Sequence, residues 1–207
     1  MTGISRRRRK RATWRGVAAA ATTTAVTALA AACGGRAVSG PRVEASAVRV
    51  VPAATAIVLE TAGPPPSDTA VSFAAGALHV VVLRHGPPEN VVFAEVSFPP
   101  RAFRVDSGRV VSVEIRPRPG VYGLEVATSQ PLRQGASVTF KYARYFSAPA
   151  RARTAFGSDV LYERALAVGQ VQAGGSALAL LPSSRPTADN LRAPLPASGI
   201  YLVAAAP

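Results

Sequence analysis

The sequence is poor in cysteine, since Cys33 is the only one among its 207 residues. A single cysteine excludes a disulfide within the chain, so a stable fold must depend on a buried core. No cysteine follows Cys33, which also excludes cysteine-ligated zinc sites in the rest of the chain. We expect no bound metal and no cofactor.

Histidine is nearly as scarce, with only His79 and His85. The base of an acyl-transfer enzyme is most often a histidine, so few catalytic arrangements are open to this chain. The spacing of the two residues does not fit the H-x-x-x-H pattern of zinc-binding helices. We interpret both as surface histidines, one in a strand and one beside the Gly86-Pro87-Pro88 turn.

Lysine is also rare, and Lys141 is the only one after position 10. The formal net charge is +13, but seven of the 24 basic residues lie in the first 15 positions. From Cys33 onward, 17 basic residues stand against 11 acidic ones, a net charge of +6. This modest balance gives no support for a nucleic-acid partner.

The first 32 residues have the order of a secretory signal peptide. A basic segment is followed by residues 17–32, which carry no charge and end in Ala30-Ala31-Ala32 before Cys33 and Gly34. We interpret 1–32 as a lipoprotein signal peptide and Cys33 as the lipidated first residue of an exported, envelope-anchored protein. A lipoprotein peptidase site usually has leucine or a similar residue three positions before the cysteine, whereas Leu29 stands four positions before Cys33. The alternative is therefore ordinary signal-peptidase cleavage after Ala32. The sequence does not decide which membrane leaflet holds the anchor.

Residues 33–66 are rich in Gly, Ala, Ser and Pro, and are interpreted as a tether between the lipid and the folded domain. Two stretches inside it, 48–51 and 56–60, contain enough β-branched residues to form short strands. The boundary between tether and domain is therefore open.

Residues 67–207 have the pattern of an all-β domain, with short runs of Val, Phe and Tyr between Gly and Pro turns. In 111–116 and 138–142, apolar and polar residues alternate, which predicts strands with one buried face. Such strands need a second sheet to cover that face, so we predict a two-sheet antiparallel β-sandwich. No interval shows a long helical stripe. The predicted strands are 78–83, 91–98, 109–116, 121–127, 136–142, 159–168, 177–181, 190–193 and 200–204.

Several blocks between residues 98 and 204 resemble the ZU-five module, a β-sandwich named after zonula-occludens proteins, uncoordinated-five netrin receptors and ankyrins, as it occurs in uncharacterised bacterial lipoproteins. Their order and spacing carry the resemblance. They are Phe98-Pro99-Pro100-Arg101-Ala102-Phe103, Tyr122-Gly123-Leu124-Glu125, Pro131-Leu132-Arg133, Val138-Thr139-Phe140-Lys141-Tyr142, Leu180-Leu181-Pro182-Ser183 and Ala193-Pro194-Leu195-Pro196-Ala197-Ser198-Gly199-Ile200-Tyr201.

The resemblance implies a degenerate self-cleavage position at Ser198. Some modules of this family cut their own backbone at His-Phe-Ser, where this chain has Pro196-Ala197-Ser198. A serine hydroxyl without an adjacent base is a poor nucleophile near neutral pH. We therefore expect no self-cleavage, no catalytic residue and no enzyme activity, and we expect Ser198 to satisfy hydrogen bonds in a turn.

One segment interleaves basic and aromatic residues in a way that suits stacking on sugars and pairing with anions. It runs from Lys141 to Phe146, with Arg151 and Arg153 close behind. The candidate ligand-binding residues are Arg144, Tyr145, Arg151 and Arg153. The acidic residues are scattered, so no catalytic carboxylate pair can be chosen from the sequence.

These observations favour a non-enzymatic, lipid-anchored envelope protein that serves as an interaction, adhesion or scaffolding module. Its expected partners are the membrane, through the lipid anchor, and an envelope protein or cell-wall polymer. The alternative is a carbohydrate-binding or carbohydrate-processing accessory domain that uses the basic and aromatic residues. A fold alone does not decide between these functions.

Overall fold

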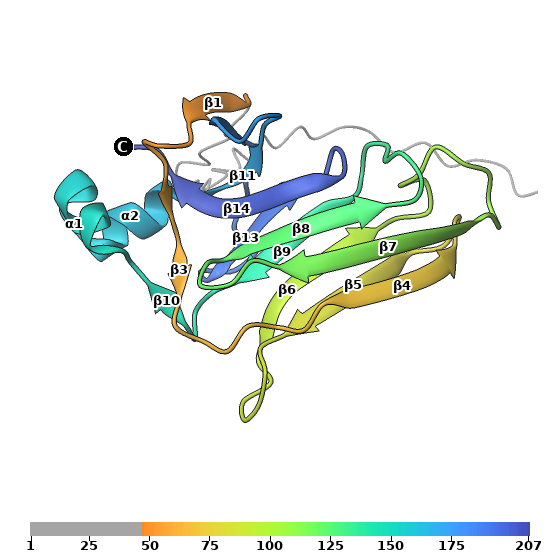
Figure 1. Cartoon of the computed structure of the whole chain (residues 1–207), viewed down its shortest axis with the longest axis horizontal. Helices are drawn as coiled ribbons and strands as arrows, with labels where there is room; N and C mark the ends of the chain where they lie inside the picture. Colours follow the sequence, from red (N-terminus) through yellow and green to blue (C-terminus); the bar gives the residue numbers. More distant parts are fainter. Residues whose placement is uncertain (1–46) are drawn as a thin grey trace, which may run out of the picture. The chain divides into compact units, whose positions relative to one another are not determined.

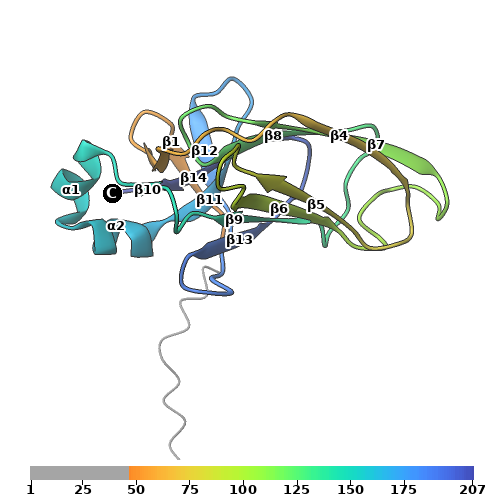
Figure 2. The same ribbon diagram turned by 90° about the horizontal axis from the view of Figure 1, so that it is seen from below.

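The computed structural model describes residues 47–207, so Cys33 and the predicted signal peptide lie outside the described residues. The described part contains fourteen strands and two short helices (Figure 1). Its two main sheets are antiparallel and pack in two layers, which confirms the predicted all-β sandwich (Figure 2).

The larger sheet runs in spatial order through strands that are distant in sequence, and all its pairs are antiparallel. Its members are β1 (Arg49–Pro52), β12 (Ala177–Leu180), β11 (Ala167–Val171), β14 (Gly199–Ala205), β8 (Gly123–Thr128), β7 (Val110–Pro117) and β4 (Thr69–Ala74), with β2 (Ile57–Val58) paired to β14.

The smaller sheet has four strands and forms the second layer of the sandwich. A separate two-stranded pair and two helices lie at one end of the molecule (Figure 2). The four strands are β13 (Asn190–Pro194), β9 (Ser137–Lys141), β6 (Val92–Phe98) and β5 (His79–Arg84); the pair is β3 (Glu60–Thr61) with β10 (Phe146–Ser147); the helices are α1 (Ala150–Phe156) and α2 (Asp159–Ala165).

The core lies between the two sheets and follows from the alternation in the sequence. Val111, Val113 and Ile115 of β7 are fully buried, while the residues between them face outward. From the other layer, Phe93 stacks on Tyr122 with ring centroids 5.1 Å apart and an interplanar angle of 9°. Burial of aliphatic and aromatic side chains thus replaces the cross-links that the sequence lacks.

The predicted strand 159–168 is wrong, because its first part is helix α2. Ser158 caps this helix by accepting a hydrogen bond from the Leu161 N–H, and Asp159 occupies the first turn. The strand that follows, β11, begins only at Ala167. A helix of seven residues is too short to produce a recognisable helical stripe. The cap at Ser158 is the local feature that favours a helix here.

Helix α1 was likewise not expected from the sequence. It begins directly after Pro149, whose fixed backbone angle suits a helix start, and it ends at Gly157, which has a φ of 78°. Both helices sit in the connection between β10 and β11.

The folded part extends into the stretch that was interpreted as a tether. Three short strands, β1, β2 and β3, lie between residues 49 and 61 and pair with β12, β14 and β10. The two strand-like stretches noted at 48–51 and 56–60 account for most of them. Residues 49–61 therefore contribute three short strands, in which Ile57 is buried and Val51 and Val58 pack against the core.

Removing the Phe93 ring should test the importance of the aromatic core. Phe93 is 1% exposed, and we expect Phe93→Ala to lower the free energy of unfolding by about 3–5 kcal/mol. Urea denaturation of the full chain measures this loss. The control Val110→Ala, at a side chain 67% exposed, should change it by less than about 0.5 kcal/mol. Equal losses in the two variants would contradict this description of the core.

Candidate functional site

Two of the predicted ligand-binding residues, Arg144 and Tyr145, are bound to Glu89. The Arg144 guanidinium donates from Nε to Glu89 Oε2 over 2.6 Å and from Nη2 to Oε1. The Tyr145 hydroxyl donates to the same Oε2 over 3.1 Å. This joins the β5–β6 loop to the segment between β9 and β10. The pair of N–H groups with which Arg144 could bind an anion is thus already occupied by a carboxylate.

The hydrogen bonds among Glu89, Arg144 and Tyr145 shift the pKa values of all three side chains. The bonds from Arg144 lower the pKa of Glu89 from its ordinary value of 4.5 to about 2. The same pairing raises the pKa of Arg144 above its ordinary value. Desolvation and the bond to Glu89 raise the pKa of Tyr145. All three groups keep one charge state across the physiological pH range.

Arg151 and Arg153 lie on α1 and make separate contacts. Arg151 donates from Nη2 to the Ala56 carbonyl over 2.7 Å, which ties α1 to the segment before β2. Arg153 forms a double hydrogen bond with Asp159 at 2.8 and 2.9 Å, which ties α1 to α2. Arg144 and Tyr145 thus share a carboxylate, while the two helix arginines serve local packing.

The expectation that His85 lies on the surface is wrong, because the residue is only 1% exposed. Its Nδ1 lies 2.8 Å from the Pro64 carbonyl oxygen and must carry the proton, since a carbonyl can only accept. Its ring packs against Phe93 and Tyr145, with ring centroids 5.1 and 4.6 Å away. Its Nε2 has no hydrogen-bond partner among the described residues. The ring therefore fastens the segment before β4 to the core.

His79 is partly buried and stacks on Phe73, with ring centroids 4.0 Å apart and an interplanar angle of 13°. This contact joins β4 of the larger sheet to β5 of the smaller one. The two histidines do not share a site. Within residues 47–207, no group of three or more His, Cys, Asp or Glu side chains could hold a metal ion.

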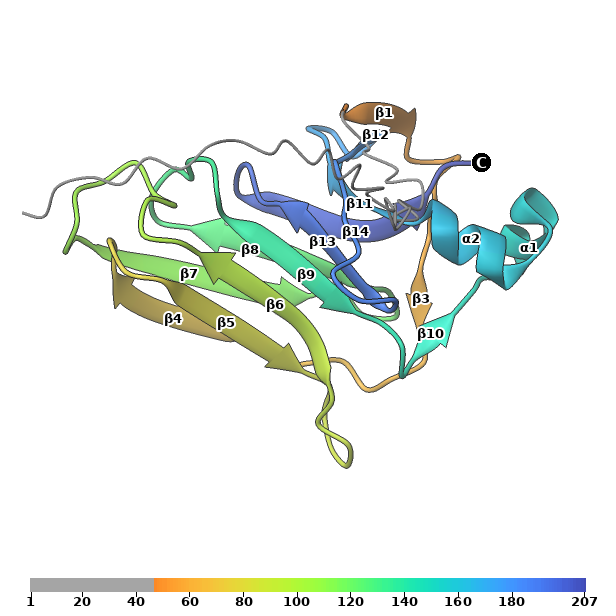
Figure 3. The same ribbon diagram turned by 180° about the vertical axis from the view of Figure 1, so that it is seen from behind.

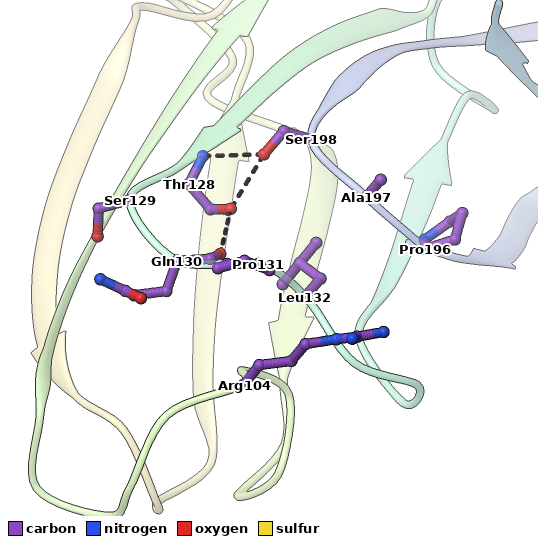
Figure 4. Close-up of a pocket in the computed structure, with 9 residues that line it drawn as sticks. All are labelled: Arg104, Thr128, Ser129, Gln130, Pro131, Leu132, Pro196, Ala197 and Ser198. Carbon is purple, nitrogen blue, oxygen red and sulfur yellow. Dashed lines mark hydrogen bonds between the residues drawn. The ribbon is translucent and has the colours of Figure 1, made fainter.

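Ser198 lies at the rim of an open depression of about 420 Å³ between the end of β8 and the start of β14 (Figure 4). Its hydroxyl accepts from the Thr128 N–H over 3.1 Å and lies 3.0 Å from Thr128 Oγ1. Because Thr128 Oγ1 donates to the Gln130 carbonyl, Ser198 must donate its own proton to Thr128.

This network leaves Ser198 without an activating base. Among the residues that line the depression, Arg104 is the only one with a charged side chain. The remaining lining residues are Thr128, Ser129, Gln130, Pro131, Leu132, Pro196, Ala197 and Ser198. The arrangement holds two strand ends together, and it lacks the base that nucleophilic catalysis requires.

A row of exposed aliphatic side chains lies on the outer face of β5 and of the residue just before it, within the stretch 78–83 that the sequence predicts as a strand. Leu78, Val80 and Val82 are 64%, 44% and 42% exposed, whereas Val81 and Leu83 face the core. We name these three exposed residues the β5 stripe. The sequence already indicates this row, because three consecutive valines, Val80 to Val82, leave no polar residue between them for an exposed face. A strand with one wet face would normally place polar residues there.

Comparisons of the chain with models of protein families, with curated proteins and with solved structures found no match. The resemblance to the ZU-five module therefore stays a prediction. Among residues 47–207, no helix is both long enough and apolar enough to cross a membrane.

The Glu89–Arg144 pair should make stability depend on pH in the acid range. A carboxyl whose folded pKa is depressed contributes stability that is complete above its unfolded value of 4.5 and is lost as the pH falls through about 2. We expect Glu89→Gln to lower the melting temperature at neutral pH, and we expect this difference to shrink below about pH 4.

Melting curves of the full chain from about pH 7 to about pH 2 measure the effect. The control is Glu125→Gln, because Glu125 lies 3.9 Å from Arg118 without a hydrogen bond to it. A difference between wild type and Glu89→Gln that stays constant over this range would contradict the proposed role of the pair.

Proposed function

We propose that the chain is a non-enzymatic protein of the bacterial cell envelope, anchored through lipid at Cys33, whose β-sandwich binds another protein. The observation that carries the proposal is the β5 stripe. Val80 and Val82 of β5, with Leu78 just before the strand, form an aliphatic row at the edge of the smaller sheet. Exposed apolar patches of this kind mark interaction surfaces more often than isolated exposed residues do.

The polar groups of the described residues support a binding role rather than catalysis. Ser198 donates to a threonine and has no base beside it. His85 is buried among aromatic rings and bonded to a backbone carbonyl. Glu89, the carboxylate with the most perturbed pKa, is held by Arg144 and Tyr145. Each group has a partner that stabilises the fold.

The resemblance to the ZU-five module agrees with this proposal, because it implies a sandwich used for interaction or scaffolding. The basic segment, the uncharged stretch and the cysteine at position 33 support export and lipid anchoring. These residues lie outside the described part, so the proposal of an anchor rests on the sequence pattern.

The alternative, carbohydrate binding through Arg144 and Tyr145, would require a sugar to displace Glu89. The double hydrogen bond from Arg144 would have to open first, and its charge-assisted character makes that costly. No contact among the described residues favours this exchange, so protein binding is the function we propose.

The proposed anchor can be tested by metabolic labelling with radioactive palmitate in a bacterial host. We expect the full chain to incorporate label and to fractionate with membranes, because Cys33 becomes acylated. Cys33→Ser should lose the label and release the chain into the soluble fraction. An unlabelled wild-type chain with its first methionine intact would contradict the anchor.

The proposed contact surface can be tested in cells with a photoreactive amino acid placed at Val82. Ultraviolet light should trap this variant as a covalent adduct with another polypeptide, since the stripe is expected to be covered in the complex. The same amino acid at Val110, which is exposed on the other sheet, provides the matched control. Adducts that form equally at both positions, or at neither, would contradict the proposed surface.

A further inference from the structure

β5 is the terminal strand of the smaller sheet, in which the order is β13-β9-β6-β5. In the described part, β5 pairs only with β6. It runs with β4 along one border of the molecule (Figures 1 and 3). An edge strand offers a row of unpaired backbone groups that another strand can use.

The backbone of β5 shows which groups face this free edge. His85 donates its N–H to the Val91 carbonyl, and therefore toward β6. Residue burial alternates from His79 to His85. The register with β6 shifts once, between Leu83 and Arg84, and the extra residue, Phe93, lies on β6, so β5 itself stays regularly extended. Successive N–H groups of a strand point to opposite sides, which directs the N–H and C=O of Val80 and Val82 toward the free edge.

The side chains of β5 are arranged symmetrically around Val80. Leu78 lies two residues before it and Val82 two residues after it, and all three point to the outer face. An antiparallel second copy with Val80 opposite Val80 would place Leu78 opposite Val82 in both halves of the contact. The β5 stripe would then become one aliphatic surface of six side chains, twice the three that one copy supplies.

The charges near β5 permit this pairing. In this register Arg84 of each copy lies opposite Gly76 of the other, so the two guanidinium groups stand about 27 Å apart along the strands. That distance exceeds the screening length of about 8 Å at physiological salt. On the neighbouring strand, Glu95 is bonded to Lys141 at 2.5 Å and brings no unpaired charge to the stripe.

We propose that two copies of the chain associate through antiparallel pairing of their β5 strands, centred on Val80. The two four-stranded sheets then form one continuous sheet of eight strands across the dimer. This inference rests on the proposed function, because it names the partner of the β5 stripe as a second copy.

Sedimentation velocity of the full chain carrying Cys33→Ser tests the dimer without interference from the lipid. We expect a reversible dimer, and we expect Val80→Glu to weaken it at least about tenfold, since two like charges would face each other across the pair. Val110→Glu is the matched control and should leave the dissociation constant unchanged, because Val110 lies on the other sheet. Circular dichroism verifies that both variants are folded.

The register is tested by single cysteines in the same Cys33→Ser background. A short bismaleimide should cross-link Val80→Cys into dimers, whereas Val110→Cys should stay monomeric. A Cys33→Ser chain with no further substitution that remains a monomer up to about 1 mM would overturn the proposal. Equal weakening by Val80→Glu and Val110→Glu, or cross-linking at residue 110 alone, would do the same.

These results separate the two proposals. A monomeric chain whose photoreactive Val82 variant captures a different protein would refute self-association and leave the proposed protein-binding function intact. A monomeric chain that forms no adduct at Val82 would refute both.

Discussion

The structure depends on the burial of two apolar sheet faces against each other. One face is aliphatic, with Val111, Val113 and Ile115 of β7, and the facing layer contributes large aromatic rings such as Phe93 and Phe140. No disulfide can share this role, because the described residues contain no cysteine. The position of every loop and of every polar cluster therefore follows from how these faces pack.

The same constraint gives the polar clusters a structural role. The loops and helices between the strands must be held in place at the ends of the sandwich, and their polar and charged side chains do this. Arg144 and Glu89 join two loops, Arg151 and Arg153 hold the helices, and Ser198 joins the ends of β8 and β14. The outer face and the edge of β5 stay free of these contacts.

The all-β class could be predicted from the sequence because apolar and polar residues alternate along a strand that has one buried face and one solvent-exposed face. It identified β7 and β9 well. Helices α1 and α2 were missed because seven residues give too little periodicity. Their signals are local ones: Pro149 and Gly157 at the two ends of α1, and the cap at Ser158 before α2. The burial of His85 and the Glu89–Arg144 pair depend on loops meeting across the sandwich, which no local pattern records.

The central claim about function is that the edge of β5 pairs with a second copy. Amide hydrogen exchange at Val80 and Val82 as a function of protein concentration measures this most directly. These N–H groups face a free edge in a single copy, so they should exchange rapidly in dilute solution. We predict that they become protected as the protein concentration rises, while the amides at the start of β7 near Val110 do not change. Exchange at Val80 and Val82 that is equally fast at every concentration would contradict it.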